Sequence, residues 1–253
     1  MEGESVSHSL KNYQKAHSLP ATGKLNWKSA RLINAKRCCH PERSWTVEEH
    51  AQRQRSTPYR ALTLTSFTQE AKPELAPDIS AEGFEPIPAR WTRKTLGFSF
   101  AGNPPSILGS AAINAVRRAF LLWEEGGVIR FQERQIPDIA EIRILWTFGP
   151  GGDPPSEDPF YGPGEKVAVS YFPYPYLGAL AGDLHFDANE RWSTDDRGIN
   201  IQTVAIHEIG HCLGLGHCFD SNSVMWPAYQ KGISGPTLKD FRALTRKYQG
   251  VPD

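Results

Sequence analysis

The spacing of apolar residues divides the chain at about residue 87. After this point, five short runs have the two-residue alternation or the β-branched content of strands. They lie at 95–100, 128–132, 141–148, 167–171 and 183–186. Apolar residues three and four positions apart predict helices at about 107–125, 200–213 and 236–248. Strands and helices therefore mix along residues 87–253, which predicts one α/β (α+β) domain.

The first third of the chain has two other patterns. Residues 1–42 combine helical spacing with a turn at 19–25, which predicts a small helical unit. Residues 43–86 contain four prolines among polar residues and sustain neither the helical nor the strand period. We expect a flexible linker here, open to proteolytic nicking.

Charge and composition exclude several classes of protein. The 28 Lys and Arg residues equal the 28 Asp and Glu residues, so no basic surface for nucleic acid is predicted. No apolar run is long enough to span a membrane, and the polar first residues show no signal peptide. The four cysteines are too few and too unevenly placed for a disulfide framework, so they do not indicate a compartment.

The segment from His207 to His217 has the pattern H-E-x-x-H-x-x-G-x-x-H. On a helix, His207 and His211 share one face and can bind one cation. Glu208 lies about 100° further round the helix, beside that cation rather than on it. Gly214 can adopt a positive φ that ends the helix and brings His217 in as a third ligand. Three protein ligands leave one tetrahedral position open for water, which indicates a catalytic zinc site.

These residues predict the chemistry of the site. Zinc held by three imidazoles lowers the pKa of a bound water from about 15.7 towards 7 and polarises a carbonyl. Glu208 would accept the proton of that water and pass it to the leaving amine of a peptide bond. No nucleophilic side chain is needed.

Met225 follows the third histidine by eight residues, and at this distance it resembles the Met-turn beneath the zinc of metzincins. Three further stretches, Arg90–Leu96, Ala115–Trp123 and Gly182–Asp187, are similar to parts of the matrix metalloproteinase (matrixin) catalytic domain. This resemblance covers about residues 87–249. It implies a metzincin catalytic domain, with a twisted mixed five-stranded sheet and three helices, in a secreted, monomeric zinc endopeptidase acting on protein substrates of the extracellular matrix.

The resemblance also implies where a substrate peptide binds. An extended substrate would lie beside Val167, Ala168 and Val169 and add a strand to an exposed sheet edge. Pro227 and Tyr229 match the family's Pro-x-Tyr wall of the pocket just past the scissile bond.

The segment before the linker resembles the matrixin pro-domain and its cysteine switch. The phrase from Tyr13 to Leu25 is similar to the peptidoglycan-binding-like fold of that pro-domain, and Lys36–Glu42 is similar to the switch motif. By alignment, Cys38 is the thiolate that binds the zinc of a latent zymogen until an activating protease cuts the linker. Cys39, in the place of the family's glycine, is a rival for this role. A disulfide from either cysteine to Cys212 or Cys218 is a further alternative.

Other metal sites of the family are only partly matched. Asp153 and His185 match two of four ligands of a structural zinc, too few to close a tetrahedron, so that zinc is not expected. Asp183, Asp187 and Glu190 match acidic positions that bind calcium, which keeps a calcium role open.

Two other classes of function stay open. The resemblance of the N-terminal unit to peptidoglycan binders is compatible with a non-catalytic zinc-holding or cell-wall-binding module, although such a module has no need of Glu208 as a base. Cys218 directly after His217 suggests an archaemetzincin-like peptidase, but no further cysteine follows it.

Overall fold

The computed structural model describes residues 82–104, 109–149, 166–195 and 197–253, together with positions 11, 14, 160 and 163 and the turn at 21–25. The predicted linker up to residue 81 lies outside the described residues, as do Cys38 and Cys39. In the described part of the predicted helical unit, the turn at 21–25 is held by the buried amide of Gln14. This amide accepts from the Gly23 N–H at 2.8 Å and donates to the Lys24 carbonyl at 2.9 Å.

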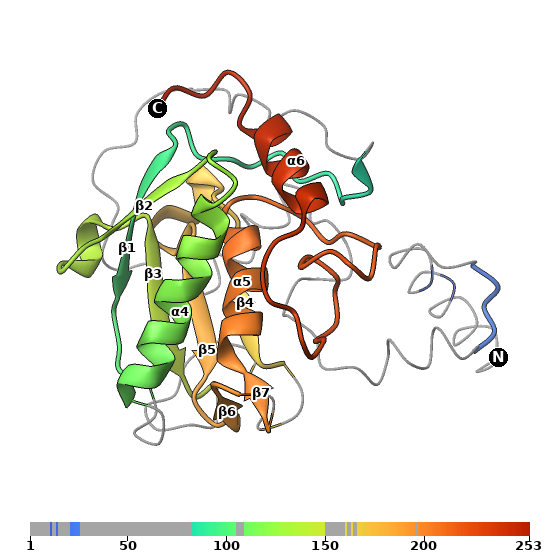
Figure 1. Ribbon diagram of the computed structural model, residues 1–253, viewed down its shortest axis with the longest axis horizontal. Coiled ribbons are helices and arrows are strands. Elements are labelled where there is room, and N and C mark those ends of the chain that lie inside the picture. The colour runs from blue at the N-terminus through green and yellow to red at the C-terminus, as the bar shows by residue number, and fades with distance from the viewer. Residues whose placement is uncertain are drawn as a thin grey trace.

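A mixed five-stranded sheet, in the order β2-β1-β3-β5-β4, forms the centre of the domain (Figure 1). Its strands are β1 (Thr95–Phe100), β2 (Arg130–Glu133), β3 (Ile142–Thr147), β4 (Ala168–Ser170) and β5 (Leu184–Asp187). The first four strands of this order run parallel, and β4 at the edge is antiparallel to β5. Residues of β3 alternate between buried and half-buried, as expected of a strand that packs helices on one face.

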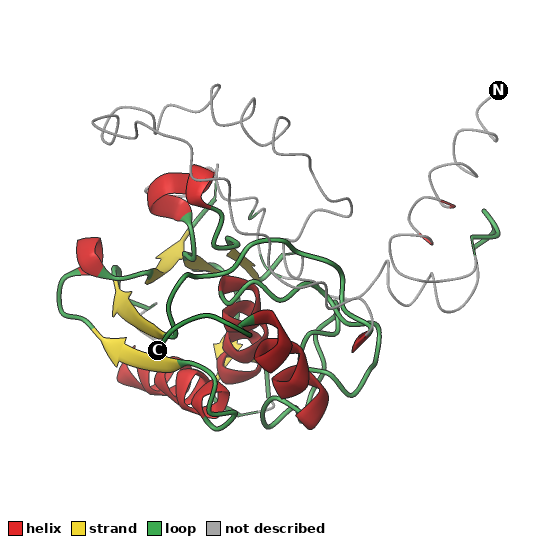
Figure 2. Cartoon of the chain, turned by 90° about the horizontal axis from the view of Figure 1, so that it is seen from above, coloured by secondary structure: helices red, strands yellow, loops and turns green. Residues whose placement is uncertain are grey.

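Two helices pack side by side against the sheet, as Figures 1 and 2 show. They are α4 (Gly109–Glu124) and α5 (Ile201–Cys212). Phe120 of α4 stacks on Phe98 of β1 with ring centroids 4.1 Å apart, which joins helix to sheet. Trp123 is fully buried, and its indole Nε1 donates to the Ile206 carbonyl of α5 at 2.8 Å. The buried indole therefore keeps a hydrogen-bond partner and fixes α5 beside α4.

The third helix, α6 (Leu238–Lys247), begins with a capping box. The Thr237 hydroxyl accepts from the Asp240 N–H, and the Asp240 carboxylate accepts from the Thr237 N–H at 2.7 Å. Within the described residues, three helices with a mixed five-stranded sheet confirm the predicted fold. No helix among the described residues is long and apolar enough to cross a membrane.

Residues 82–91, called here the N-terminal segment, pack along the domain beside α6 (Figure 1). Phe84 is 3% exposed and forms a β-bridge with Cys218. Lys247 of α6 is fully buried, and its ammonium donates to the Ile87 carbonyl at 2.6 Å. Trp91 Nε1 donates to the Cys212 carbonyl at 2.9 Å. Residues 82–86 fall within the predicted linker, yet they contact the domain.

The predicted elements differ from the observed ones mainly at their ends. The three helices and five strands start or stop within three residues of the predicted bounds. Four short elements were not predicted: the 3-10 turns η3 (Pro137–Ile139) and η4 (Pro175–Leu180), and the two-residue parallel strands β6 (Trp192–Ser193) and β7 (Ile199–Asn200). Elements this short carry too few residues for a periodic pattern.

Candidate metal centre and active site

Helix α5 carries the first two histidines of the motif. Its N-terminus is capped by Asn200, whose side chain accepts from the backbone N–H groups of Gln202 at 3.0 Å and Thr203 at 3.3 Å. Gly210 on this helix lies against Met225, since a Cβ there would be 2.2 Å from the Met225 sulfur. The glycine thus lets the fully buried Met225 pack directly under the helix that carries the histidines.

After α5 the chain reverses sharply, as the motif predicts. Gly214 has a φ of +84°, and a Cβ at this position would lie 2.3 Å from the Ala89 carbonyl oxygen. A side chain here would therefore be strained by backbone conformation and by contact with the N-terminal segment. The reversal places His217 beside the two helical histidines.

The three imidazoles of His207, His211 and His217 form one cluster, in which one ligand atom from each lies within 4.8 Å of the others. The Nδ1 atom of His207 is 2.8 Å from the Val224 carbonyl oxygen, and that of His211 is 2.7 Å from the Leu215 carbonyl oxygen. Because an Nδ1–H facing a carbonyl leaves the lone pair on Nε2, both rings are in the tautomer that binds a metal through Nε2. Among the described residues this is the only group of three or more His, Cys, Asp or Glu side chains within reach of one ion.

The electrostatics of the cluster suit a metal cation. The Nε2 atom of His207 is buried and has no hydrogen-bond partner within the described residues. Burial lowers the pKa of His207 to about 4, although the Val224 carbonyl acts in the opposite direction, so the ring is neutral near pH 7. A neutral imidazole with an orphaned buried nitrogen fits zinc, which would satisfy it.

Glu208 is 1% exposed and lies next to this cluster. Burial raises the pKa of Glu208 to about 8, while a hydrogen bond from Ser170 acts to lower it. The Ser170 hydroxyl donates to Oε2 at 2.5 Å, and Oε1 is buried without a partner among the described residues. One carboxyl oxygen is thus held by the edge strand β4, and the other is available for a proton transfer. A zinc ion at the neighbouring histidines would lower the raised pKa of Glu208 and favour the ionised form that a general base needs.

The segment around Met225 is tied to both α5 and α6. Val224 carries the carbonyl that faces His207, and its N–H donates to the buried Asp240 carboxylate at 3.3 Å. The Ser223 hydroxyl donates to the same carboxylate. Asp240 therefore joins the capping box of α6 to the turn that orients a histidine.

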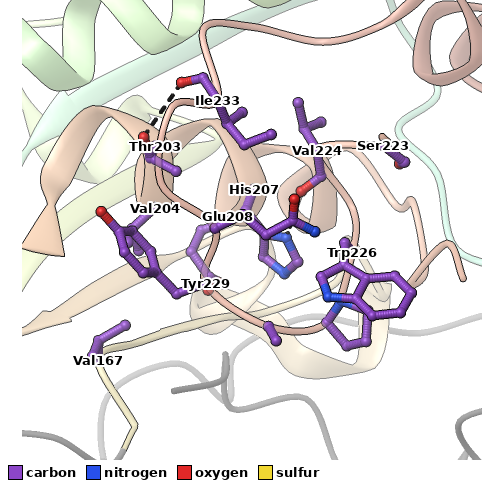
Figure 3. A pocket seen from close by; sticks show the side chains of 13 residues that line it. Val167, Thr203, Val204, His207, Glu208, Ser223, Val224, Trp226, Tyr229 and Ile233 are labelled. Carbon is purple, nitrogen blue, oxygen red and sulfur yellow. Dashed lines mark hydrogen bonds between the residues drawn. The ribbon is translucent and has the colours of Figure 1, made fainter. Parts of the chain in front are cut away.

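A pocket opens beside His207 and Glu208, with about 420 Å³ of empty space including its open mouth (Figure 3). The other side chains around it come from α5, from the residue before β4 and from the stretch 223–233 on both sides of Met225: Val167, Thr203, Val204, Ser223, Val224, Trp226, Pro227, Ala228, Tyr229, Gln230 and Ile233. The Tyr229 hydroxyl accepts from the Asn200 N–H at 3.1 Å, and the Thr203 hydroxyl donates to the Ile233 carbonyl at 3.4 Å. Both bonds hold the pocket wall to the start of α5.

The predicted substrate-binding residues divide into two groups. Val167, Pro227 and Tyr229 line the pocket. Ala168 and Val169 do not, because the Ala168 side chain belongs to the main core and Val169 packs with Phe160 in a separate small cluster. These two residues lie on β4, which pairs only with β5 within the described residues, so any contact with substrate there would be through the backbone of the edge.

Of the three acidic residues that match calcium positions, Asp183 does not fit a calcium ion. The Arg143 guanidinium binds both of its carboxylate oxygens, with Nε 2.9 Å from Oδ1 and Nη2 2.5 Å from Oδ2. The Asp183 side chain is 2% exposed, so its negative charge is buried. The Arg143 guanidinium supplies the positive charge that a calcium ion would otherwise bring.

Asp187 has the opposite character. It is fully buried, its Oδ1 accepts from the Asn189 N–H at 2.8 Å, and its Oδ2 has no partner within the described residues. Desolvation raises the pKa of Asp187, and the charge of Glu190 raises it further. A cation between Asp187 and the buried Glu190 would relieve both effects.

The two cysteines near the motif are free and fully buried. Burial is the first cause that raises the pKa of both the Cys212 and the Cys218 thiols. Both are therefore poor nucleophiles for disulfide exchange in the folded domain.

Four side chains of the site were not found from the sequence: Glu85, Arg143, Ser170 and Asp240. Each acts through a partner 16 to 132 residues away in the chain. Asp240 had a local signal, because Thr237 three residues before it is typical of a capping box.

Comparisons with known proteins agree with this geometry. The matrixin family matches residues 90–249. Human matrix metalloproteinase-15 is 33% identical over 98% of this chain and 34% of its own length. Karilysin of Tannerella forsythia is 37% identical over 56% of this chain and 29% of its own length. Metalloendoproteinase 1 of Glycine max is 29% identical over 89% of this chain and 66% of its own length. The chain thus spans about a third of the first two relatives.

Proposed function

Because the chain belongs to the matrixin family of zinc-dependent metalloendopeptidases, we propose that it hydrolyses internal peptide bonds of protein substrates. His207, His211 and His217 would hold the catalytic zinc, and Glu208 would be the general base. The observation that carries this proposal is the cluster of three imidazoles, with ligand atoms within 4.8 Å of one another, beside a buried carboxylate.

In this proposal the protein groups act on protons and on the substrate backbone. When bound, zinc supplies an activated water and polarises the scissile carbonyl. Glu208 accepts a proton at Oε1 and returns it to the leaving amine, while Ser170 fixes Oε2. The edge of β4 that no described strand covers would align the peptide, and the pocket bounded by Pro227 and Tyr229 would receive a side chain next to the cleaved bond.

The test combines metal analysis with cleavage of a peptide library. We expect one zinc per folded chain and endopeptidase products that disappear with a chelator and return with zinc. A His217→Ala variant should lose the metal. A folded wild type without zinc, or one whose cleavage persists after complete metal removal, would contradict the proposal.

We also propose that the chain is a latent, secreted zymogen, and that Cys38 inhibits the zinc centre until a protease cuts the linker. A thiolate is a strong zinc ligand, whereas a serine hydroxyl is not. The buried, free state of Cys212 and Cys218 favours this thiolate mechanism over a disulfide to either of them. Cys38→Ser should be active without cleavage and Cys39→Ser should stay latent. The reverse result would move the switch to Cys39, and an active, uncut wild type would refute latency.

Calcium is proposed at Asp187 and Glu190 only. The Oδ2 of Asp187, which has no partner among the described residues, supports this placement, and the ion pair between Arg143 and Asp183 argues against Asp183 as a ligand. Unfolding curves of the wild type and of Asp187→Asn, each with and without calcium, test it.

A further inference from the structure

The three histidines of the cluster are oriented by two different kinds of partner. His207 and His211 face backbone carbonyl oxygens through Nδ1. His217 instead lies with its Nδ1 3.4 Å from the Oε2 of Glu85, and these two side chains are 8% and 28% exposed. The third ring is therefore the one whose orienting group carries a negative charge.

Glu85 contacts His217 at backbone level as well. Its N–H donates to the His217 carbonyl at 2.8 Å, and the His217 N–H donates to Oε2 at 3.1 Å. A single carboxylate oxygen thus faces both the main-chain and the ring nitrogen of the same residue. This arrangement fixes the position of the backbone and the rotation of the ring together.

The fold makes room for this contact. A Cβ at Gly216 would lie 2.6 Å from the Glu85 carbonyl oxygen and 2.7 Å from the Glu85 Cβ. A glycine is therefore needed where the N-terminal segment crosses the loop before His217. Phe84, the preceding residue, is buried and bridged to Cys218, so the segment is held on both sides of the contact.

We propose that Glu85 is a positioning residue of the zinc centre, which holds His217 in the orientation and tautomer that bind the metal. This inference rests on the proposed function of His217 as a zinc ligand. A carboxylate behind a ligating imidazole fixes its ring and strengthens it as a donor, and loss of such a partner weakens metal binding about 10- to 100-fold.

The experiment measures the zinc dissociation constant of the full chain by competition with a chromophoric chelator. Glu85→Ala removes both the charge and the acceptor, and the dissociation constant should rise about 10- to 100-fold. Glu85→Gln keeps the shape and one oxygen acceptor but loses the charge, so a smaller rise is expected and the fold is preserved. The visible spectrum of the cobalt-substituted chain should also change in Glu85→Ala, because the third ligand is no longer held in place.

The matched control is Glu82→Ala. Glu82 lies on the same segment and pairs with Arg246 of α6 at 3.3 Å, but it contacts no histidine of the cluster. The zinc affinity of the Glu82→Ala variant should equal that of the wild type. An equal loss in Glu82→Ala would show that general anchoring of the segment is responsible and would overturn the proposal, as would unchanged affinity in both Glu85 variants.

Zinc binding by the wild type distinguishes failure of this inference from failure of the proposed function on which it rests. A wild type that binds zinc while the Glu85 variants bind it equally well refutes the positioning role alone. A wild type that binds no zinc refutes the proposed function, and the positioning role with it.

Discussion

The histidine cluster and the acidic residues around β5 lie on neighbouring elements of one domain, yet their polar atoms have different kinds of partner. The three imidazoles have their Nδ1 atoms directed at oxygen atoms, which leaves a donor set fit for an added metal. At the start of β5, Asp183 has an internal cation instead, the Arg143 guanidinium. At its end, Asp187 keeps a buried oxygen without a partner among the described residues.

This difference shows that a matched residue type does not by itself preserve a metal site. The acidic residue can stay the same in the sequence while a neighbouring arginine replaces the metal ion as its cation. Such a replacement is visible only from the position of the arginine in the structure. The histidine cluster depends on rings whose supports are mostly backbone carbonyls, which substitutions alter less directly. Four experiments test this difference between the two regions.

The largest effect is expected at Glu208. Glu208→Ala should keep zinc and fold but lower peptide turnover by about two to four orders of magnitude, because the general base is lost. Steady-state kinetics with a fluorogenic peptide, alongside metal analysis, would measure this. Glu133→Ala, which removes a partner of Arg117 away from the site, is the control. Retained turnover would assign the base elsewhere, and loss of zinc would make Glu208 structural.

The second-largest effect is expected at Arg143, the cation paired with Asp183, and it concerns the stability of the fold. Arg143→Met removes the guanidinium from the buried Asp183 carboxylate and leaves, among the described residues, only the His185 ring, 3.7 Å away, as a possible cation, so the free energy of unfolding should fall by about 3–5 kcal/mol. Urea denaturation measures this change. Arg117→Met, which breaks an exposed pair with Glu133, should cost about 1 kcal/mol or less. If added calcium restores the stability of Arg143→Met, the arginine has replaced a metal ion; if both variants lose equal stability, the buried pair has no special role.

Calcium should act at the other end of β5. Calcium at about 100 times its dissociation constant should stabilise the wild type by about 2.7 kcal/mol, and Asp187→Asn should weaken this response. Without calcium, the raised pKa of Asp187 means that the folded form prefers a protonated carboxyl. Stability should therefore fall as the pH rises through the range just above 3.8, and calcium should remove this dependence. No calcium response in the wild type would rule the site out.

The smallest effect is expected at Ser170. Ser170→Ala removes one hydrogen bond to Glu208, worth about 1 kcal/mol, so kcat should fall roughly five-fold with KM unchanged. Ser170→Thr keeps a hydroxyl and should retain more activity. A change confined to KM would instead place Ser170 in contact with substrate along β4.

The clustering of the three histidines beside Glu208 could be predicted because these residues lie within eleven positions of the chain. Spacing on one helix places His207, Glu208 and His211, and the positive φ of Gly214 follows from the need for a sharp reversal. Glu85 left no such signal, since it is 132 residues from its partner and sits among prolines and polar residues that are typical of a linker. Arg143 likewise occupies a half-buried strand position, where an arginine is usually a solvated charge.

The N-terminal segment also has a consequence for the proposed activation by cleavage. If the proposed cut falls before residue 82, Phe84 and Glu85 stay in place, and the cleaved chain keeps the side chain behind His217. A cut after residue 85 separates both residues from the domain and leaves the surface at Cys218 uncovered. One precursor would then give two products of unequal metal retention, and the choice of cleavage bond would set how long each stays active in a zinc-poor medium.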